Sequence, residues 1–320
     1  MEQAGGSAHA IADDLIVCTR NRPSEVRDCL ATVAAQTRVP VNVVVVDSSG
    51  DDATLRVVEA LVPTWPASSS LRHVRSEPAT TRQRNVGIDV TRGVVVHFVD
   101  DDTLLDPGYI EAVLGLFEAD RTEAIAGVGG FVTNQPEHRL TFVDELLGLD
   151  SRREGVVLPS GRNTRLYTEP AWPVEVDWLA GCAMSFRRAV FDTVRPDSRR
   201  GTNRNGEDLD LSYRVRQHWP LLITPRARIL HLEAAEGRRT AEELAVVEMI
   251  SRYERVLAGT GVYSRRAFWI SVWGQLAWFT FKAAVTLSRS RFAIARATLR
   301  GIRAIRAARR SGLLILAEPA

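Results

Sequence analysis

The chain has 320 residues, of which 45% are hydrophobic and 25% are charged, values typical of a soluble globular protein with a substantial core. Its three cysteines are scattered without a CxxC pair, which argues against a disulfide framework and a zinc site and fits a reducing compartment. The formal net charge is +2, but the chain before residue 255 is acidic overall, whereas residues 255–317 contain basic side chains and no Asp or Glu. An acidic body with a basic tail indicates two separate roles.

Strand and helix signals alternate through the first hundred residues. Short apolar runs predict strands at 15–19, 41–47, 71–76 and 94–99. Helices are expected between them, at about 24–36, after the loop "SSGDD" and at 80–91. The run "VNVVVVD" does not alternate between polar and apolar residues, as is typical of parallel strands covered on both faces. This order predicts a parallel sheet with right-handed crossovers.

The chain after residue 105 is less regular. The segment 128–134 predicts a strand, and we expect mostly loops in 151–175. "VDWLAGCAMSFRRAVFDTV" predicts a strand that leads into a helix. A further helix is expected from about Asp208 to His218, followed by two short strands. No internal repeat or low-complexity linker divides the chain.

Polar loops follow three of the predicted strands where each strand ends. They are "TRNRP", "DSSGDD" and "DDD". Ligands of open α/β sheets bind outside the carboxyl ends of the strands, so these loops can converge on one crevice. The phosphate-binding patterns GxGxxG and GxxxxGK[ST] are absent, which argues against a Rossmann dehydrogenase and a P-loop protein.

The three consecutive aspartates end the strand at 94–99. On an extended segment, Asp100 and Asp102 point roughly the same way. Clustered carboxylates suit Mg²⁺ or Mn²⁺, which proteins bind through one or two carboxylates plus substrate phosphates. The alternative is a solvated turn or a helix N-cap, where Asp is also favoured.

Four segments occur in a defined order: "VCTRNRPSEVRDCLATVAAQT", "VVVVDSSGDDAT", "TRQRNVGIDVTRGVVVHFVDDDTLLDP" and "NGEDLDLSYRVR". They resemble the opening strand and helix, the base-binding Asp loop, the Arg-Asn-Gly helix with its DxD strand, and the later acidic motif of family 2 glycosyltransferases. The resemblance covers residues 14 to about 235. It implies an α/β fold of the GT-A (Rossmann-like) type, with a mostly parallel sheet flanked by helices and a C-terminal helical tail.

The same resemblance implies donor-binding residues. Asp47 would hydrogen-bond the nucleotide base, and Thr19 and Asn21 would line that pocket. Arg84 and Asn85 would face the base or the diphosphate. The alternatives are a helix-capping Asx turn for Asp47 and a solvated helix face for Arg84.

The resemblance also implies a metal site. Asp100 would contact the ribose and contribute to the metal site, and Asp102 would bind a Mn²⁺ or Mg²⁺ ion that bridges the diphosphate. Asp101 would belong to the residues that bind the nucleotide sugar. His231, which follows the run "RARIL", would complete the metal site. For His231, a purely structural hydrogen bond is the alternative.

The acidic motif implies the catalytic residues. Asp208 would be the base that deprotonates the acceptor hydroxyl, supported by Glu207, since neighbouring carboxylates oppose each other's ionisation. Favourable charges in the first turn of a helix are the alternative. Trp178 would offer a flat apolar face on the acceptor side, or would simply be part of the core. The reaction implied is a single displacement with inversion at the anomeric carbon.

The tail combines an aromatic-rich segment, 267–287, with a basic amphipathic one, 288–310. Its Phe, Ala, Leu and Ile residues recur at helical spacing between arginines, as in helices that lie on anionic membranes. Packing on the acidic body, a homodimer contact and a true membrane span are the alternatives. Polar residues and three tryptophans dispersed through 267–287 disfavour the span.

Together these patterns predict a GT-A-like catalytic domain at 1–254 and a basic, aromatic-rich helical segment at 255–320. Within the catalytic domain we expect a nucleotide-binding half at about 14–105 and an acceptor-side half at about 106–254.

The expected function is an inverting, metal-dependent transfer from a nucleoside-diphosphate sugar, with UDP or dTDP favoured, to a hydroxyl of a glycan or lipid-linked acceptor in cell-envelope synthesis. We expect no nucleic-acid partner. The N-terminus lacks signal-peptide features, which favours a cytoplasmic protein, peripheral on the inner face of the cell membrane through 267–310. An inactive nucleotide-sugar-binding subunit is one alternative. A sugar nucleotidyltransferase is another, but it would carry a Gly-rich basic loop where this chain has "TRNRP".

Overall fold

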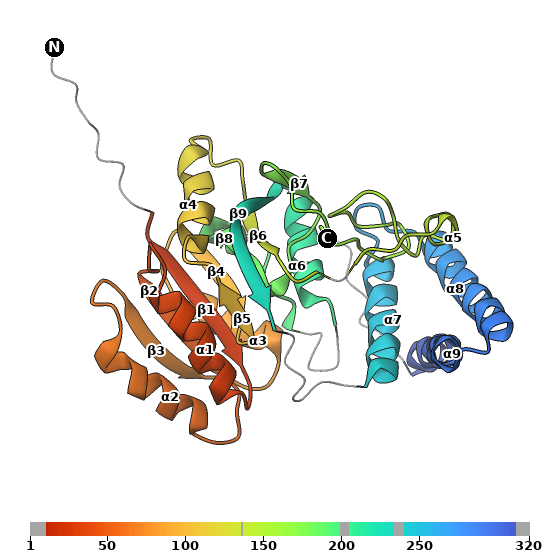
Figure 1. Ribbon diagram of the computed structural model, residues 1–320, viewed down its shortest axis with the longest axis horizontal. Coiled ribbons are helices and arrows are strands. Elements are labelled where there is room, and N and C mark those ends of the chain that lie inside the picture. Colours follow the sequence, from red (N-terminus) through yellow and green to blue (C-terminus); the bar gives the residue numbers. More distant parts are fainter. Residues whose placement is uncertain (1–10, 136, 199–204, 233–239, 312–320) are drawn as a thin grey trace, which may run out of the picture.

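One mixed sheet with its flanking helices forms the larger part of the molecule, which we call the body. The computed structural model describes residues 11–135, 137–198, 205–232 and 240–311. Within these residues the sheet has nine strands, with the order β3-β2-β1-β4-β8-β6-β9-β5, and β7 pairs with β9. Helices cover both faces of this sheet, and three long C-terminal helices lie together at one end of the molecule (Figure 1).

The first half of the sheet is parallel, as the sequence predicts. Its strands are β1 (Asp13–Thr19), β2 (Asn42–Asp47), β3 (Ser70–Arg75) and β4 (Val95–Asp100). The connecting helices are α1 (Pro23–Ala34), α2 (Ala53–Leu61) and α3 (Thr80–Val90). The carboxyl ends of these strands meet at one edge, which brings the three polar loops together.

The second half of the sheet is mixed. It contains β5 (Thr103–Leu105), β6 (Gly127–Val132), β7 (Val174–Val176), β8 (Met184–Arg187) and β9 (Leu221–His231). β8 runs antiparallel to both β4 and β6, β6 is parallel to β9, and β5 and β7 are antiparallel to β9. The parallel arrangement therefore holds for β1 to β4, and strand pairs of both directions complete the sheet.

The structure differs from two of the sequence predictions in this half of the sheet. The two short strands expected after residue 218 are one long strand, β9, whose register with β6 shifts between Gly130 and Phe131. Pro225, which lacks an N–H group, lies opposite this shift, so the strand continues through a local irregularity. The helix expected after β8 is only a short 3₁₀ turn, Arg188–Asp192.

Both faces of the sheet are buried. Leu15 and Val17 pack into one hydrophobic cluster with α1 and with α4 (Tyr109–Ala119). Ile16 points to the opposite face, where α3 and α6 (Glu207–Arg216) contribute. Burying each such aliphatic side chain stabilises the fold by about 1.5–3 kcal/mol. The strands therefore read as continuous apolar runs because helices cover them on both sides.

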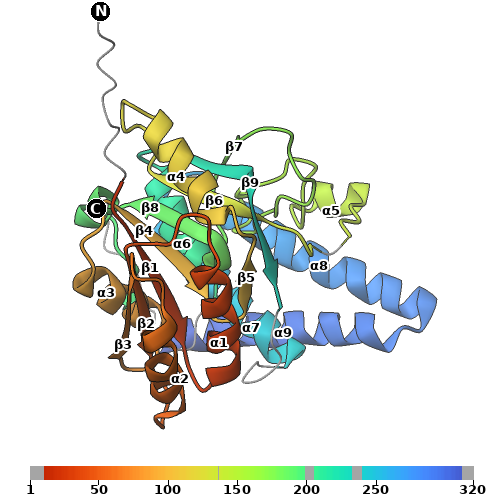
Figure 2. The same ribbon diagram turned by 60° about the vertical axis from the view of Figure 1, so that its left-hand side comes forward.

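The C-terminal helices form a unit with its own core, which we call the helical unit. It consists of α7 (Ala241–Ala258), α8 (Arg265–Thr286) and α9 (Arg289–Arg310), and α8 and α9 form a projecting helical hairpin (Figure 2). Their shared cluster comprises Met249, Tyr253, Val256, Phe268, Val272, Ile302 and Ile305. The expected boundary between residues 254 and 255 falls inside α7. Among the described residues, no helix combines the length and the apolarity needed to cross a membrane.

Candidate active site

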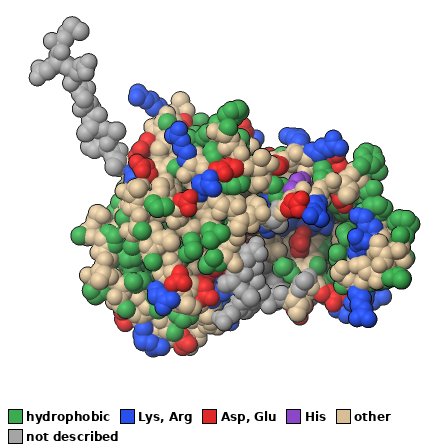
Figure 3. Space-filling view, viewed as in Figure 1, with side chains coloured by type: hydrophobic (Ala, Val, Ile, Leu, Met, Phe, Trp, Pro, Cys, Tyr) green, Lys and Arg blue, Asp and Glu red, His purple; other side chains and the backbone are tan. Residues whose placement is uncertain are grey.

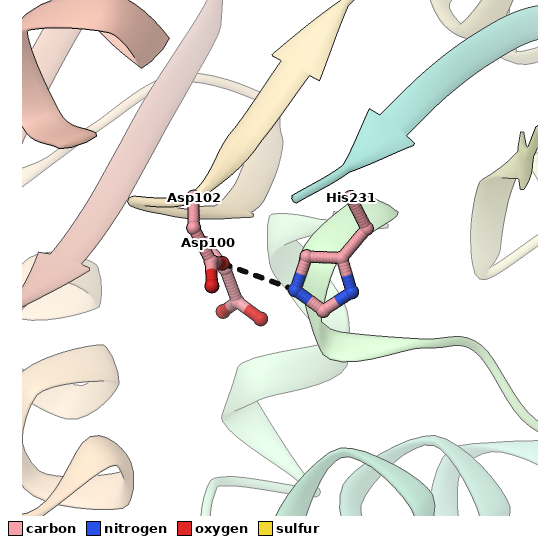
Figure 4. Close-up of side chains that lie close together, drawn as sticks. All are labelled: Asp100, Asp102 and His231. Atoms are coloured by element: carbon pink, nitrogen blue, oxygen red, sulfur yellow. Dashed lines mark hydrogen bonds and ion pairs between the residues drawn. The ribbon is translucent and has the colours of Figure 1, made fainter. Parts of the chain in front are cut away.

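Two aspartates and a histidine meet at the carboxyl edge of the sheet. β4 ends at Asp100, a tight turn follows, and β5 pairs with the end of β9 so that Thr103 lies opposite His231. The imidazole Nε2 of His231 lies 3.0 Å from Asp102 Oδ1 (Figure 4). One donor atom from each of Asp100, Asp102 and His231 lies within 4.8 Å of the others. The structure thus brings together the three residues expected at the metal site.

The donor set fits the metal that the sequence implies. Two carboxylates and one imidazole supply oxygen and nitrogen ligands of the kind that Mn²⁺ accepts, and Mg²⁺ is commonly held by one or two carboxylates. Asp102 is buried and Asp100 is partly exposed, so the set faces solvent on one side. Burial raises the pKa of Asp100, while Arg84 and His231 oppose this shift. A bound cation would relieve the cost of placing these carboxylates together.

Asp101 points away from this set and connects two loops. It accepts a hydrogen bond of 2.7 Å from the Thr19 hydroxyl, and Arg22 Nη1 lies 3.1 Å from its Oδ1. The same Arg22 nitrogen lies 3.4 Å from Asp102 Oδ2. Burial raises the pKa of Asp101 to about 6, although the Thr19 bond and Arg22 lower it. Arg22, which the sequence reasoning missed, places a positive charge beside the metal site.

Asp47 lies at the end of β2 and is fully buried. Its carboxylate accepts hydrogen bonds from Ser49 N at 2.8 Å and from Arg75 Nη1 at 2.8 Å, and His73 Nε2 lies 3.0 Å away. The Ser49 bond is an Asx turn, but Asp47 does not cap a helix, since the N-cap residue of α2 is Asp52. Asn21 joins the same corner, with its N–H 2.7 Å from the Ser49 hydroxyl and a φ of 56°. His73 and Arg75 had no signal in the sequence beyond their place at the end of a weak strand.

Arg84 lies between the two acidic motifs. It is 3% exposed, and its Nη2 and Nη1 lie 3.8 Å from Asp100 Oδ1 and 4.0 Å from Glu207 Oε1. Burial disfavours its charge, but Glu207 and Asp100 raise its pKa overall. It is therefore not part of a solvated helix face.

The neighbouring α3 residues Gln83 and Asn85 hold the backbone. The amide of Asn85 donates to Pro196 O at 2.9 Å. The amide of Gln83, also missed, donates to Thr19 O and Val46 O at 2.8 Å each, which ties the ends of β1 and β2 together.

Glu207 and Asp208 begin α6. Asp208 Oδ2 accepts a 2.9 Å hydrogen bond from Gly181 N, and its Oδ1 accepts one of 2.8 Å from Leu209 N. Burial raises the pKa of Glu207, Arg84 opposes this, and Asp208 adds to it. A Cβ atom at Gly181 would lie 2.6 Å from Arg84 Nη2 and 3.2 Å from Asp208 Cβ, so a larger residue here would shift the guanidinium of Arg84.

A cavity of about 150 Å³ lies beside these groups. Asp100, Asp208, His231 and Trp178 all line it. The indole N–H of Trp178 donates to Thr164 O at 2.9 Å, which orients the ring. Eight of the residues expected at the site do not line this cavity: Thr19, Asn21, Asp47, Arg84, Asn85, Asp101, Asp102 and Glu207.

Known proteins resemble this chain in sequence and in fold. The family model for "Glycosyl transferase family 2" matches residues 14–194. An uncharacterized glycosyltransferase, YwdF, from Bacillus subtilis (strain 168) is 25% identical over 158 residues, which are 48% of this chain and 58% of that protein. The match thus spans less than two thirds of that relative's length.

Two solved structures share the fold at 14% sequence identity and a TM-score of 0.58 each. The first is GalNAc-T7 with UDP, GalNAc and Mn²⁺. The similarity covers 78% of this chain and 48% of the GalNAc-T7 chain. The second is a mannosyltransferase from Pyrobaculum calidifontis in complex with GDP-Man and Mn²⁺. The similarity covers 92% of this chain and 86% of the mannosyltransferase chain. Both likenesses confirm the GT-A-type architecture. With the family model matching more than half of the residues, the chain belongs to glycosyl transferase family 2.

Proposed function

We propose that the protein is an inverting, metal-dependent glycosyltransferase that uses a nucleoside-diphosphate sugar. The observation that carries this proposal is the cluster of Asp100, Asp102 and His231 beside a cavity that Asp208 also lines. This arrangement offers a cation site and a basic carboxylate on two sides of one space. A protein that only bound nucleotide sugars would not need the second group, and neither would a sugar nucleotidyltransferase.

Asp100, Asp102 and His231 would hold Mn²⁺ or Mg²⁺. The ion, when bound, would neutralise charge that develops on the leaving nucleoside diphosphate. Arg22 and Arg84 lie beside these carboxylates and would add positive charge on the diphosphate side. Both guanidiniums are held by aspartates, so their positions are set before the donor binds.

Asp208 would take the proton from the acceptor hydroxyl as it attacks the anomeric carbon. The two backbone N–H groups that bond its oxygens fix the carboxylate, and each oxygen keeps a further lone pair for the hydroxyl. Glu207 would support it through Arg84, which it approaches to 4.0 Å. One displacement, with no covalent enzyme intermediate, inverts the anomeric centre.

The donor nucleotide would be UDP or dTDP, recognised at the corner formed by Thr19, Asn21 and Asp47, with Arg84 and Asn85 nearby. The two similar structures hold UDP and GDP-Man with Mn²⁺, which supports a nucleoside diphosphate donor. Asp47 Oδ1 already accepts from the N–H and the hydroxyl of Ser49, and Oδ2 lies within 3.0 Å of Arg75 and His73. A contact with the base would therefore require one of these partners to give way to the nucleotide.

The acceptor would be a glycan or a lipid-linked glycan of the cell envelope, stacked on Trp178. The helical unit supports a position on the inner face of the cell membrane. In Figure 3, basic and hydrophobic side chains lie next to one another on the part of the surface over α8 and α9. The exposed large apolar residues of α8, α9 and the turn between them are Ile270, Trp273, Phe281, Val285, Leu287, Phe292, Ile294 and Leu299. Arginines between them suit anionic headgroups, and a second copy of the chain is the alternative occupant of this surface.

Calorimetric titration of UDP, dTDP, GDP and CMP, with and without Mn²⁺, tests the proposal. We expect one nucleoside diphosphate to bind only with the metal, and Asp102→Ala to abolish that binding. Asp106→Ala is the matched control, since Asp106 is an exposed carboxylate just after β5. Absence of nucleotide binding by the wild-type protein under both conditions would overturn the proposal.

A further inference from the structure

The helical unit contains a cavity that the transferase chemistry does not use. It lies between α7, α8 and α9 and has a volume of about 340 Å³, compared with about 150 Å³ beside His231. The two cavities share no lining residue. One wall is apolar, formed by Ala245 and Met249 from α7 and by Ala293, Ile294 and Ala297 from α9. A space of this size and composition suits a small ligand with an apolar part.

A buried arginine also lines this cavity. Arg252 is 2% exposed, and its Nη2 donates to Ser160 O at 3.0 Å and to Ser271 Oγ at 3.3 Å. Its Nε is buried without a hydrogen-bond partner. Burial, with Arg162 nearby, lowers the pKa of Arg252 well below its ordinary value. A guanidinium this deeply buried needs a compensating negative charge.

The carboxylates of the cavity wall are engaged elsewhere. Glu242 Oε1 lies 3.0 Å from Arg300 Nη1, and Glu248 Oε1 lies 3.9 Å from Arg162 Nη1. No carboxylate of the described residues lies within 4.0 Å of the guanidinium of Arg252. The cavity therefore pairs an apolar wall with a buried guanidinium that has no ion-pair partner among the described residues; its nearest compensation is the Phe268 ring, 5.3 Å from Arg252 Cζ, and the more distant charge of Glu248.

We propose that this cavity binds an amphiphilic anion. The phosphate or carboxylate head group would bind Arg252, with Arg162 beside it, and an alkyl chain would lie along the wall between α7 and α9. The first turns of α9, which line the cavity, follow directly after Leu287, an apolar residue that is 82% exposed. A membrane lipid could reach the cavity at this end of the hairpin, and a free amphiphile has the same chemistry. This inference does not depend on the proposed transferase activity.

Calorimetry with octyl phosphate, octanol and inorganic phosphate tests the inference on the full chain. We expect octyl phosphate to bind one site at least ten-fold more tightly than either octanol or inorganic phosphate. Arg252→Met should weaken octyl phosphate binding at least ten-fold. Arg255→Met is the matched control, because Arg255 is also buried on α7 but bonds Asn205 O and Gly161 O and does not line the cavity.

A second variant, Ala297→Phe, keeps the arginine but fills the space for the chain, and should also lose binding. Its fold can be checked by circular dichroism and thermal unfolding. Equal binding of octanol and octyl phosphate, or unchanged octyl phosphate binding by Arg252→Met, would overturn the proposal.

Vesicles of phosphatidylcholine with or without phosphatidic acid distinguish a membrane lipid from a free amphiphile as the source of the ligand. If Arg252→Met weakens octyl phosphate binding and also lowers binding to vesicles that contain phosphatidic acid, the ligand is a membrane lipid. If it weakens octyl phosphate binding but leaves binding to both kinds of vesicle unchanged, the ligand is a free amphiphile.

Discussion

Arginines inside the body and inside the helical unit differ in the partners that they bind. In the body, Arg187 binds Asp120 at 3.3 Å and Arg188 binds Asp14 at 3.2 Å, while Arg84 lies between two acidic motifs. In the helical unit, Arg252 is as deeply buried but bonds only neutral groups. Buried charges are normally paired, as these arginines of the body are, whereas Arg252 has no ion-pair partner among the residues that the structure describes. Of the arginines in the helical unit, Arg252 combines this incomplete pairing with a cavity beside it, which supports the ligand proposed there.

The largest effect is expected at the proposed base. Asp208→Asn keeps the shape of the side chain but removes its ability to accept a proton, so kcat should fall by roughly 10²- to 10⁴-fold. Affinity for the nucleotide should stay within about two-fold, since Asp208 lines the cavity in which we propose that the acceptor binds. Steady-state kinetics and calorimetry measure the two quantities. Asp210→Asn, on the same helix but bonded to Arg214 at 3.1 Å, is the control and should retain most activity. Loss of nucleotide binding in Asp208→Asn would contradict the assignment.

The contact between the two acidic motifs depends on a glycine. In Gly181→Ala the new Cβ would lie 2.6 Å from Arg84 Nη2 and would displace it from Glu207 and Asp100. We expect kcat/KM to fall by at least about ten-fold, because small displacements of positioned groups slow catalysis strongly. The control is Gly115→Ala in α4, where a Cβ meets nothing within 4 Å and helix propensity favours Ala by about 1 kcal/mol. Equal activity of both variants would show that Arg84 does not need its present position.

Paired and unpaired arginines should also differ in their effect on stability. Arg187→Met leaves Asp120 without its buried partner and should reduce the free energy of unfolding by about 3 kcal/mol. Arg252→Met removes a buried charge that has no ion-pair partner among the described residues. The relief of this charge offsets the loss of its two hydrogen bonds, so the free energy of unfolding should change by no more than about 1 kcal/mol. Urea unfolding followed by circular dichroism measures both. A larger loss for Arg252→Met than for Arg187→Met would reverse the comparison.

The smallest effect concerns the turn between α8 and α9. Leu287 ends α8 with a φ of 49°, whereas α7 ends at Gly259 with a φ of 70°. Because the left-handed conformation costs an L-residue about 1 kcal/mol relative to glycine, Leu287→Gly should stabilise the protein by roughly that amount. If this exposed leucine contacts a membrane, the same variant should bind anionic vesicles less tightly. A vesicle co-sedimentation assay checks this, and unchanged binding would remove Leu287 from the membrane contact.

The sequence by itself determined the parallel half of the fold and the acidic motifs. Runs such as "VNVVVVD" are readable because strands buried on both faces need apolar residues at every position. Asp100 and Asp102 are close in sequence, so their common direction follows from strand geometry alone. The grouping of Glu207 with Asp208 at a helix start is local for the same reason.

Only the tertiary structure decided which distant groups meet. His231 joins Asp102 because β5 pairs with β9, a contact between segments 129 residues apart. Arg84 is buried because the loop at Gly181 and the start of α6 close over it, whereas a helical pattern alone would favour a solvated arginine. The apolar stripe of α9 is divided in the same way: Ala295, Ile302 and Ile305 are buried in the helical unit, while Phe292 and Leu299 are exposed. Local preference sets each element, but the choice of neighbours depends on long-range packing, which no single segment encodes.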